Sequence, residues 1–408
     1  MNMQVETADQ KLRARARRVI PGGMYGHMRA DGLPAGYPQF FARGEGCHIW
    51  DVDGRRYVDF MCSWGPNILG HKHPAVLEAV QRQLAAGDCL NGPTERLVEL
   101  AERLVRLVPA ADWALFSKNG TDATTTCVTL ARAETGRKKI LAARGAYHGA
   151  VPWCTPYPFG VTAEDRAHLI EYVYNDIESL EAAVAKAGDD LAGIIASAFR
   201  HDYGFDQELP NAEFARRARE LCDKAGAALI LDDVRAGFRL TLHGSWDLVG
   251  VQPDLSAWSK AIANGHALAA VTGNDRFRDA ASRLYVTGSF WTGSVPMAAA
   301  VATLDELERI DAPNLLRALG QRFRDGIAAQ SAKSGVGVRQ SGPPQMPTIL
   351  FDGDVNYAKG ERFCQEALKR GVYLHPKHNM FLSTAHTEAD IDFALTATEA
   401  AFAVLAAG

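Results

Sequence analysis

The chain has 408 residues, of which 47% are hydrophobic, and its formal net charge is −4. This balance excludes the basic surface that binds nucleic acid or an anionic membrane, and no apolar run approaches the ~20 residues of a membrane-spanning helix. Seven scattered cysteines without a CxxC pair, and an N-terminus without an apolar signal region, predict free thiols and a cytoplasmic protein.

The first sixty residues combine short predicted elements with a polar loop. The segment 22–36 is rich in glycine and proline, yet it carries Tyr25, His27 and Arg29. We therefore interpret it as a loop with functional side chains. The elements predicted in this region are a helix over 11–20 and strands over 40–44, 47–51 and 57–60.

Two histidines, His71 and His73, lie in the loop before a predicted helix over 75–86. They could bind a metal ion, but no third ligand stands at a recognisable spacing. An ordinary pair of loop histidines is the better interpretation, so we expect no metal site.

A predicted strand over 113–116 is followed by a polar, glycine-containing turn and a helix over 122–134. This arrangement points free backbone N–H groups at a phosphate. Thr121 and Asp122 also suit an N-cap, so an ordinary helix start is the alternative. Both interpretations stay open on the residues alone.

Strands and helices keep alternating to about residue 305, which predicts a mostly parallel sheet with helices on both faces. The pattern changes from about residue 306, where we expect a smaller α+β domain. The further elements expected before residue 305 are a helix over 94–107, strands over 139–142, 194–196, 229–231, 255–258 and 269–272, and helices over 213–225 and 297–304. Those expected after it are helices over 315–331 and 388–406 and strands near 347–352 and 372–375.

Three of these strands end in residues that carry chemistry. Asp232 ends one apolar run, Lys260 follows another, and Tyr147 lies between glycines after a third. Ligands of open α/β sheets gather at the carboxyl ends of strands. The lysine has two interpretations: a solvated surface residue, or a Schiff-base lysine whose aldehyde cofactor is protonated at its ring nitrogen by the aspartate.

The ordered set of motifs resembles the class III aminotransferases of PLP fold type I, and within them the glutamate-1-semialdehyde aminomutase-like branch. Each motif is weak, but together they span nearly the whole chain in the family's order. The stretches that carry the resemblance are Ile20-Pro21-Gly22-Gly23, Trp50-Asp51-Val52-Asp53-Gly54, Ser63-Trp64-Gly65-Pro66 with Gly70-His71, Asn119-Gly120-Thr121-Asp122-Ala123, Thr135-Gly136-Arg137-Lys138-Lys139-Ile140, Tyr147-His148-Gly149, Leu231-Asp232-Asp233-Val234 with Gly237-Phe238-Arg239, and Ser259-Lys260 with Gly265.

The resemblance implies an α/β fold with pyridoxal 5′-phosphate (PLP) as its cofactor. Residues 61–305 would form the large domain around the mostly parallel sheet, and residues 306–408 the small α+β domain. Residues 1–60 would pack with the small domain. The family also implies a homodimer with shared active sites, in which Ser289, in place of the family's threonine, completes the neighbour's phosphate site.

The family assigns roles to the matched positions. Lys260 would bind the cofactor and then move a proton as the catalytic base, Asp232 would pair with the pyridinium, and Tyr147 would stack on the ring opposite Val234. Asp202 stands where the family has an asparagine. The implied cofactor-binding residues are Asn119, Gly120, Thr121, Tyr147, His148, Asp202, Asp232, Val234, Lys260 and Ser289.

The resemblance also implies the substrate site and the reaction. Arg29 and Trp64 would bind a substrate carboxylate, with Arg200 as a further candidate. We predict ping-pong transamination between a carboxylate-bearing amine, such as a β-, γ- or ω-amino acid, and a 2-oxo acid. The segment 375–380 is shorter than the aminomutase pattern and lacks its glutamate. An intramolecular aminomutase is therefore the alternative, and a non-catalytic protein of the same fold a remote one.

Overall fold

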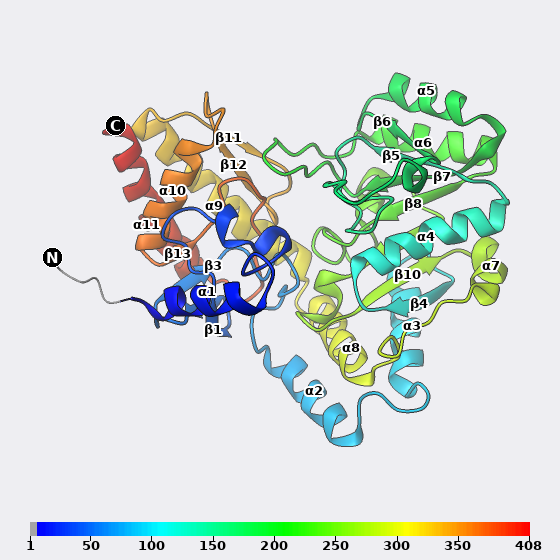
Figure 1. The fold of residues 1–408 in the computed structure, drawn as a ribbon, viewed down its shortest axis with the longest axis horizontal. Helices are drawn as coiled ribbons and strands as arrows, with labels where there is room; N and C mark the ends of the chain where they lie inside the picture. The colour runs from blue at the N-terminus through cyan, green and yellow to red at the C-terminus, as the bar shows by residue number, and fades with distance from the viewer. Residues whose placement is uncertain (1–5) are drawn as a thin grey trace.

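The structure is a computed structural model that describes residues 6–408, so the first five residues of the predicted 1–60 segment lie outside it. Figure 1 shows two lobes. The larger holds a seven-stranded sheet, and the smaller holds both the first strands of the chain and its last helices. In the described part of the chain, no helix combines the length and the apolar character that crossing a membrane requires.

The seven-stranded sheet has the order β4-β10-β9-β8-β7-β5-β6. Its strands are β4 (Trp113–Ser117), β5 (Lys139–Ala143), β6 (Leu169–Tyr172), β7 (Leu191–Ser197), β8 (Ala228–Asp232), β9 (Leu255–Trp258) and β10 (Ala269–Gly273). Strand β10 is antiparallel to both of its neighbours, and the other pairs are parallel. Within this sheet only β10 therefore runs backwards, in agreement with the predicted mostly parallel sheet.

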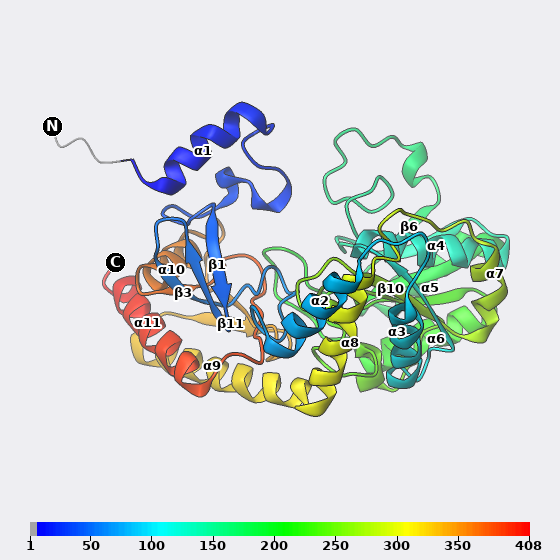
Figure 2. The ribbon, with the colours of Figure 1, turned by 90° about the horizontal axis from the view of Figure 1, so that it is seen from below.

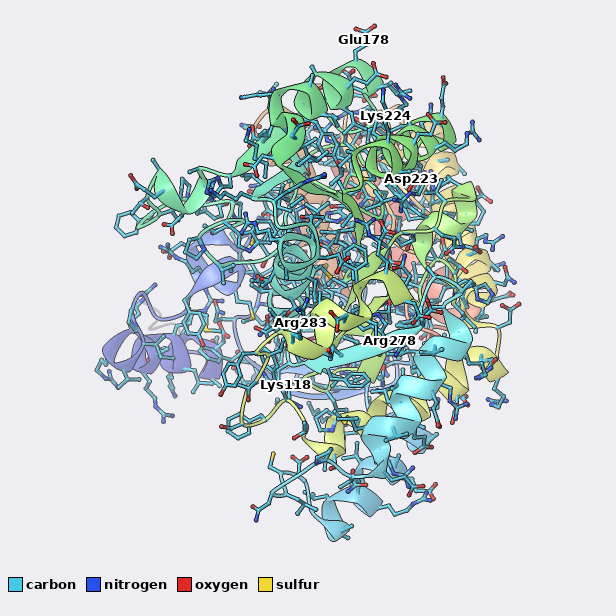
Figure 3. The ribbon with its side chains drawn as sticks, turned by 90° about the vertical axis from the view of Figure 1, so that its right-hand side faces the viewer. Lys118, Glu178, Asp223, Lys224, Arg278 and Arg283 are labelled. Carbon is cyan, nitrogen blue, oxygen red and sulfur yellow. The ribbon has the colours of Figure 1, made fainter. Side chains whose placement is uncertain are left out.

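The central strands are hydrophobic without interruption because helices cover both faces. In β8, Leu229 and Leu231 belong to one buried cluster, whereas Ala228 and Ile230 belong to another. This alternation follows from the two-residue period of a strand. The first face packs on α5 (Ile177–Ala187) and α6 (Ala212–Ala225), and the second on α4 (Gly120–Thr135) and α7 (Arg278–Arg283). Charged residues of these helices lie on the outside, where Figure 3 labels Glu178, Asp223, Lys224, Arg278 and Arg283.

The smaller lobe joins the two ends of the described chain in one sheet. Its four strands have the order β1-β2-β3-β13, and β13 pairs in parallel with β3, with Val372 opposite Val58. A two-stranded sheet and four helices complete the lobe. The elements are β1 (Phe41–Glu45), β2 (His48–Asp51), β3 (Arg56–Asp59), β11 (Val338–Ser341), β12 (Thr348–Phe351), β13 (Val372–Tyr373), α1 (Ala8–Val19), α9 (Ala312–Ser334), α10 (Ala358–Lys369) and α11 (Glu388–Ala406).

Three further helices lie along the larger lobe: α2 (Pro74–Ala86), α3 (Glu95–Leu107) and α8 (Ser294–Arg309). Figure 2 shows α8 and α9 running in succession from the larger lobe to the smaller one. Sequence analysis found no strand at β6 or β11 and no helix at α5, α7 or α10. Strands β6 and β11 have only four residues each, and their half-exposed patterns give too little periodicity to recognise.

Candidate active site

The predicted aspartate and lysine lie side by side at the carboxyl edge of the larger sheet. Asp232 is the last residue of β8, and its register partner on the adjacent strand β9 is Ala257. Lys260 follows β9 and begins a short 3-10 helix, Lys260–Ala263. Its φ of 48° is left-handed, an unusual conformation for a lysine, and such strain is concentrated at functional sites.

Asp232 is held by a buried histidine. The Nδ1 atom of His148 lies 2.7 Å from Oδ2 of Asp232, and the His148 side chain is almost completely buried. The other carboxylate oxygen accepts a hydrogen bond from the amide of Val234 at 3.1 Å. The Thr124 hydroxyl, on α4, donates a hydrogen bond to the His148 carbonyl at 2.6 Å, which fixes the histidine against this helix. The carboxylate is thus oriented before any ligand binds.

The neighbouring acid, Asp233, has a structural role instead. It accepts a hydrogen bond from the Ser245 amide at 2.7 Å and another from the Ser245 hydroxyl. Burial raises the pKa of Asp233 to about 6. The two consecutive carboxylates therefore have different partners, and only Asp232 contacts His148.

Helix α4 begins at the predicted phosphate turn. Its N-cap is Asn119, which forms a capping box with Asp122, so neither Thr121 nor Asp122, the two residues considered for this position, is the N-cap. The Asn119 side chain accepts a hydrogen bond from the backbone amide of Asp122, and the Asp122 carboxylate accepts one from the backbone amide of Asn119. The amides of the first helical turn, including those of Gly120 and Thr121, have no acceptor within the helix. They remain available for an anion.

Two glycines shape the surface beside this helix start. A Cβ at Gly120 would lie 2.6 Å from a methyl carbon of Val234, and a Cβ at Gly149 would lie 2.6 Å from Oγ1 of Thr121. Glycine therefore permits a close approach at both positions. The start of α4 meets the turn after Asp232 at this surface, because Val234 contacts Gly120 and its amide bonds to Asp232. Together with the lysine, these residues fit the cofactor that the resemblance implies, with phosphate, ring nitrogen and aldehyde each matched by a suitable group.

The surroundings of Lys260 favour its neutral form. Burial and the nearby cations Arg235 and Arg239 lower its pKa to about 8, although Asp232 opposes the shift. Arg239 is fully buried and donates hydrogen bonds to the carbonyls of Gly65, at 2.6 Å, and Leu382. A lysine whose neutral form is readily reached suits a Schiff base or a general base.

Arg235 is a site residue that sequence analysis missed. Its Nη1 atom donates hydrogen bonds to Nε2 of His378 at 2.9 Å and to Oδ1 of Asn379 at 2.6 Å. Burial lowers the pKa of this guanidinium to about 10, and the carboxylate of Asp232 opposes the shift. The signal that could have found it is its place: an arginine three residues after Asp232, in the turn at the carboxyl edge of the sheet.

Four histidines and a tryptophan form a wall beside Arg235. The Trp64 ring centroid lies 4.5 Å from that of His27, 5.4 Å from that of His375 and 5.1 Å from that of His378. Burial lowers the pKa of each of these imidazoles and that of His201, and it brings the pKa of His375 to about 3. The positive charge of Arg235 adds to the effect for His27, His201 and His378. The wall is therefore polar but uncharged at neutral pH.

The remaining predicted substrate and cofactor residues differ in their surroundings. Arg29 is exposed and lies 3.3 Å from Asp31. Arg200 is paired with Asp202 at 2.8 Å and with Glu208 at 2.7 Å, so its guanidinium already has two acids. The Tyr147 side chain, after β5, keeps 40% of its surface exposed. Ser289 lies in an exposed segment before α8.

The two loop histidines considered as metal ligands do not meet. His71 contacts Asp59 at 3.1 Å, and His73 lies 3.7 Å from Glu306. Among the described residues, the ligand atoms close enough to share an ion belong to a different group in the smaller lobe: Cys47, His48 and Asp390.

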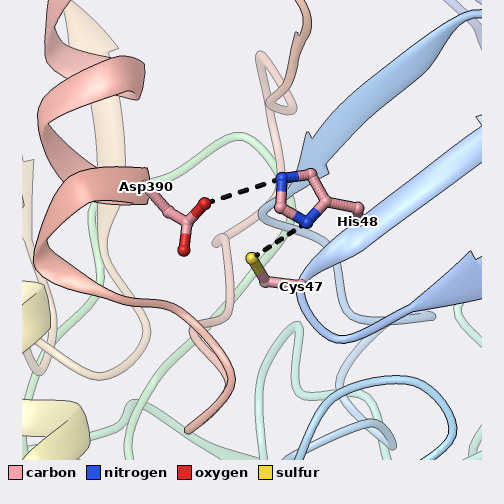
Figure 4. A group of neighbouring side chains, drawn as sticks. All are labelled: Cys47, His48 and Asp390. Atoms are coloured by element: carbon pink, nitrogen blue, oxygen red, sulfur yellow. Dashed lines mark hydrogen bonds and ion pairs between the residues drawn. The ribbon is translucent and has the colours of Figure 1, made fainter.

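The contacts within that group do not describe a metal centre (Figure 4). The Cys47 thiol lies 3.5 Å from Nδ1 of His48, whereas Asp390 lies 3.6 Å from Nε2 of the same ring. A single ion cannot use both nitrogens of one imidazole. Burial, with Asp390 nearby, also raises the pKa of the Cys47 thiol, which keeps it protonated and a poor ligand.

Comparisons with known proteins agree with this geometry. The sequence model of the family described as Aminotransferase class-III matches residues 34–395. An aminopentol aminotransferase of Sphingopyxis macrogoltabida is 49% identical over 399 residues, which cover 98% of this chain and 94% of the relative. A glutamate-1-semialdehyde 2,1-aminomutase of Leptothrix cholodnii is 35% identical over 436 residues, covering 97% of this chain and 98% of the relative.

Among solved structures, the chain is similar to the FumI protein of Sphingopyxis sp. MTA144, described as its PLP internal aldimine form. The TM-score is 0.96 at 49% identity, and the match covers 97% of this chain and 96% of that one. This similarity confirms the predicted PLP fold type I.

Proposed function

The chain belongs to the class III aminotransferase family and is PLP-dependent, and on this premise we propose the roles of its residues and the classes of its substrates. One observation carries the proposal. Asp232, at the end of β8, is paired with His148, and Lys260, whose pKa is lowered, follows the adjacent strand β9. The reaction is transfer of an amino group from an amine to a 2-oxo acid by a ping-pong mechanism.

Each matched residue has a task suited to its surroundings. When bound, PLP supplies an electron-withdrawing ring that stabilises negative charge at the substrate carbon. The Nζ atom of Lys260 would remove the proton from that carbon and return it two atoms away in a 1,3-proton shift, because its neutral form is well populated near pH 8. Asp232, oriented by His148, would hold the ring nitrogen, and the start of α4 would hold the phosphate.

Two donor classes follow from different observations. The sequence motifs favour a carboxylate-bearing amine. The 49% identical relative is named for aminopentol, a name that describes an amine with five hydroxyl groups. The uncharged wall of His27, His201, His375, His378 and Trp64 favours this second class, since neutral imidazoles exchange hydrogen bonds with hydroxyls and do not select a carboxylate.

The aminomutase alternative receives less support. The aminomutase relative is 35% identical, whereas the aminotransferase relative is 49% identical. An aminomutase retains its intermediate and needs no acceptor. The membership of this chain in the glutamate-1-semialdehyde aminomutase-like branch within the family therefore stays a proposal, supported by the motif order alone.

The assembly and the domain division are also proposals. A homodimer in which Ser289 reaches the partner's phosphate site is supported by the exposed segment around it, where Tyr285 keeps 92% and Phe290 68% of the side chain exposed. Pairing of β3 with β13 supports packing of residues 1–60 with residues 306–408, around a large domain of 61–305. The seven cysteines, all free in the described chain, support a cytoplasmic location.

The test is a panel of amines supplied with pyruvate as the acceptor. We expect alanine and the matching carbonyl compound in equal amounts, and parallel double-reciprocal lines when donor and acceptor are varied together. The panel contains β-amino acids, ω-amino acids and hydroxylated alkyl amines, which separates the two donor classes. Lys260→Ala is the control and should form no alanine. Formation of an isomer of the donor without any acceptor would show that the aminomutase reading is the right one.

A further inference from the structure

Arg235 differs from Arg29 and Arg200, the arginines predicted for the substrate site, in having no acid partner. Within residues 6–408 it forms no ion pair, whereas Arg29 is paired with Asp31, and Arg200 with Asp202 and Glu208. Its hydrogen bonds go to an imidazole and an amide oxygen, both of which are neutral acceptors. A cation held among neutral groups in a protein interior is costly unless a ligand supplies the counter-charge.

The unpaired part of this guanidinium is accessible. In the described structure all its hydrogen bonds come from Nη1, which leaves the donors of Nε and Nη2 free. Neither atom is among the buried polar atoms that lack a partner, although Nε of fully buried Arg239 is. Arg235 is half-buried, and its free edge therefore faces open space rather than packed protein. The amine of Lys260 has the same properties: half-buried, without a hydrogen bond, and not enclosed.

Two groups fix the orientation of that edge. His378 donates from Nδ1 to the carbonyl of Asn379 at 2.6 Å, so its Nε2 is the lone-pair nitrogen that accepts from Arg235. The Asn379 side chain donates to the Met380 carbonyl at 3.0 Å, which turns its oxygen toward the guanidinium. Both partners belong to the segment after β13, so the smaller lobe fixes the Nη1 atom of Arg235.

The charges around Arg235 favour an added anion. After burial, the charge of Arg235 lowers the pKa of Lys260 more than any other group does. The two cations are therefore close to one another. The acids that act on Arg235 electrostatically are Asp232 and Asp202, and both are committed to other partners, His148 and Arg200. A planar carboxylate matches the two free donors of an arginine fork.

We propose that Arg235 binds the carboxylate of the 2-oxo acid acceptor, beside the reactive amine of Lys260. This inference rests on the proposed function and names the residue that selects the acceptor. A ping-pong enzyme binds donor and acceptor in turn at one site. With a donor that lacks a carboxylate, Arg235 acts in the second half-reaction, and the neutral wall around Trp64 contacts the donor in the first.

The experiment compares Arg235→Gln and Arg235→Lys with Arg29→Gln, which removes the competing arginine predicted from the sequence. The holoenzyme is assayed with one amine donor and with either pyruvate or acetaldehyde, which lacks the carboxylate. We expect Arg235→Gln to lower kcat/KM for pyruvate by about 30-fold or more, the usual loss for a buried charge pair. The value for acetaldehyde should change by less than about threefold, and Arg235→Lys should keep part of the selectivity.

A binding measurement gives a readout that is independent of turnover. Propionate, an unreactive carboxylate, should bind the wild-type holoenzyme in a calorimetric titration, and Arg235→Gln should abolish that binding while Arg29→Gln leaves it intact. Equal losses for pyruvate and acetaldehyde, retained propionate binding, or a loss of PLP affinity at unchanged pyruvate KM would each overturn the proposal. If the wild type forms no alanine from any amine, the proposed function fails, and propionate binding still decides the role of Arg235.

Discussion

Replacing Lys260 by methionine should stabilise the cofactor-free protein, although it destroys the active site. Burial and the cations around the lysine lower its pKa from 10.5 to about 8. One pKa unit corresponds to about 1.4 kcal/mol, so the native state at pH 7 loses on the order of 3 kcal/mol by holding a protonated amine there. Methionine has a similar length and no charge. Lys260→Met should therefore raise the free energy of unfolding by that order.

The pH dependence separates this cause from altered packing. Because the folded pKa lies below the unfolded one, the unfolded state binds more protons between pH 8 and 10.5. Wild-type stability should therefore rise with pH across this window relative to the variant. At pH 9.5 the difference between variant and wild type should shrink to about 1–1.5 kcal/mol, whereas any packing contribution is the same at both values of pH.

The assay is urea unfolding of both proteins at pH 7 and 9.5, after removal of the cofactor and at one protein concentration. The exposed Lys224 on α6 provides the matched control, because Lys224→Met removes a lysine that water already solvates. Its effect should stay within about 0.5 kcal/mol. A stability difference for Lys260→Met that does not change with pH, or a variant less stable than the wild type at pH 7, would refute the reasoning.

Three further predictions concern the cofactor site. Asp232→Asn removes the charge that His148 orients and should lower kcat by at least ~100-fold, with weaker PLP binding in equilibrium dialysis; a rate near that of the wild type would contradict the assignment. Gly149→Ala places a Cβ 2.6 Å from Oγ1 of Thr121 at a φ of +135°, so it should reduce the free energy of unfolding by about 1–3 kcal/mol and weaken PLP binding; unchanged values would contradict the close approach. Mixing Lys260→Ala and Ser289→Ala subunits should restore activity in heterodimers, because one of the two sites then carries neither change; verified heterodimers without activity would rule out sharing.

The strand-end residues could be predicted from the sequence because buried parallel strands leave a clear local pattern. The runs before Asp232 and Lys260 are apolar and short, and the carboxyl ends of such strands meet at one edge. The reversed direction of β10 left no such pattern, since a fully buried strand has the same composition in either direction. Its antiparallel pairing with β4 and β9 depends on tertiary contacts that the local sequence does not reveal.

Arg235 could not be recognised because the features that distinguish it are tertiary. In the sequence it is one of 44 lysines and arginines, and an arginine in a turn is usually solvated. Its lack of an acid partner depends on His378 and Asn379, more than 140 positions away. For the same reason the histidines 201 and 375 could not be assigned from the sequence. Their neutral state follows from burial, which the residue type does not reveal.

The pairing of β3 with β13 has a consequence for the order in which the nascent chain folds. Asp59 faces Tyr373, and after Asp59 a further 373 − 59 = 314 residues must be synthesised before Tyr373 is present. At roughly 5–20 residues per second this takes about 16–60 s. The seven-stranded sheet, which ends at Gly273, has all its strands well before then. The larger lobe can therefore fold during synthesis, whereas the edge of β3 stays unpaired until β13 has been made.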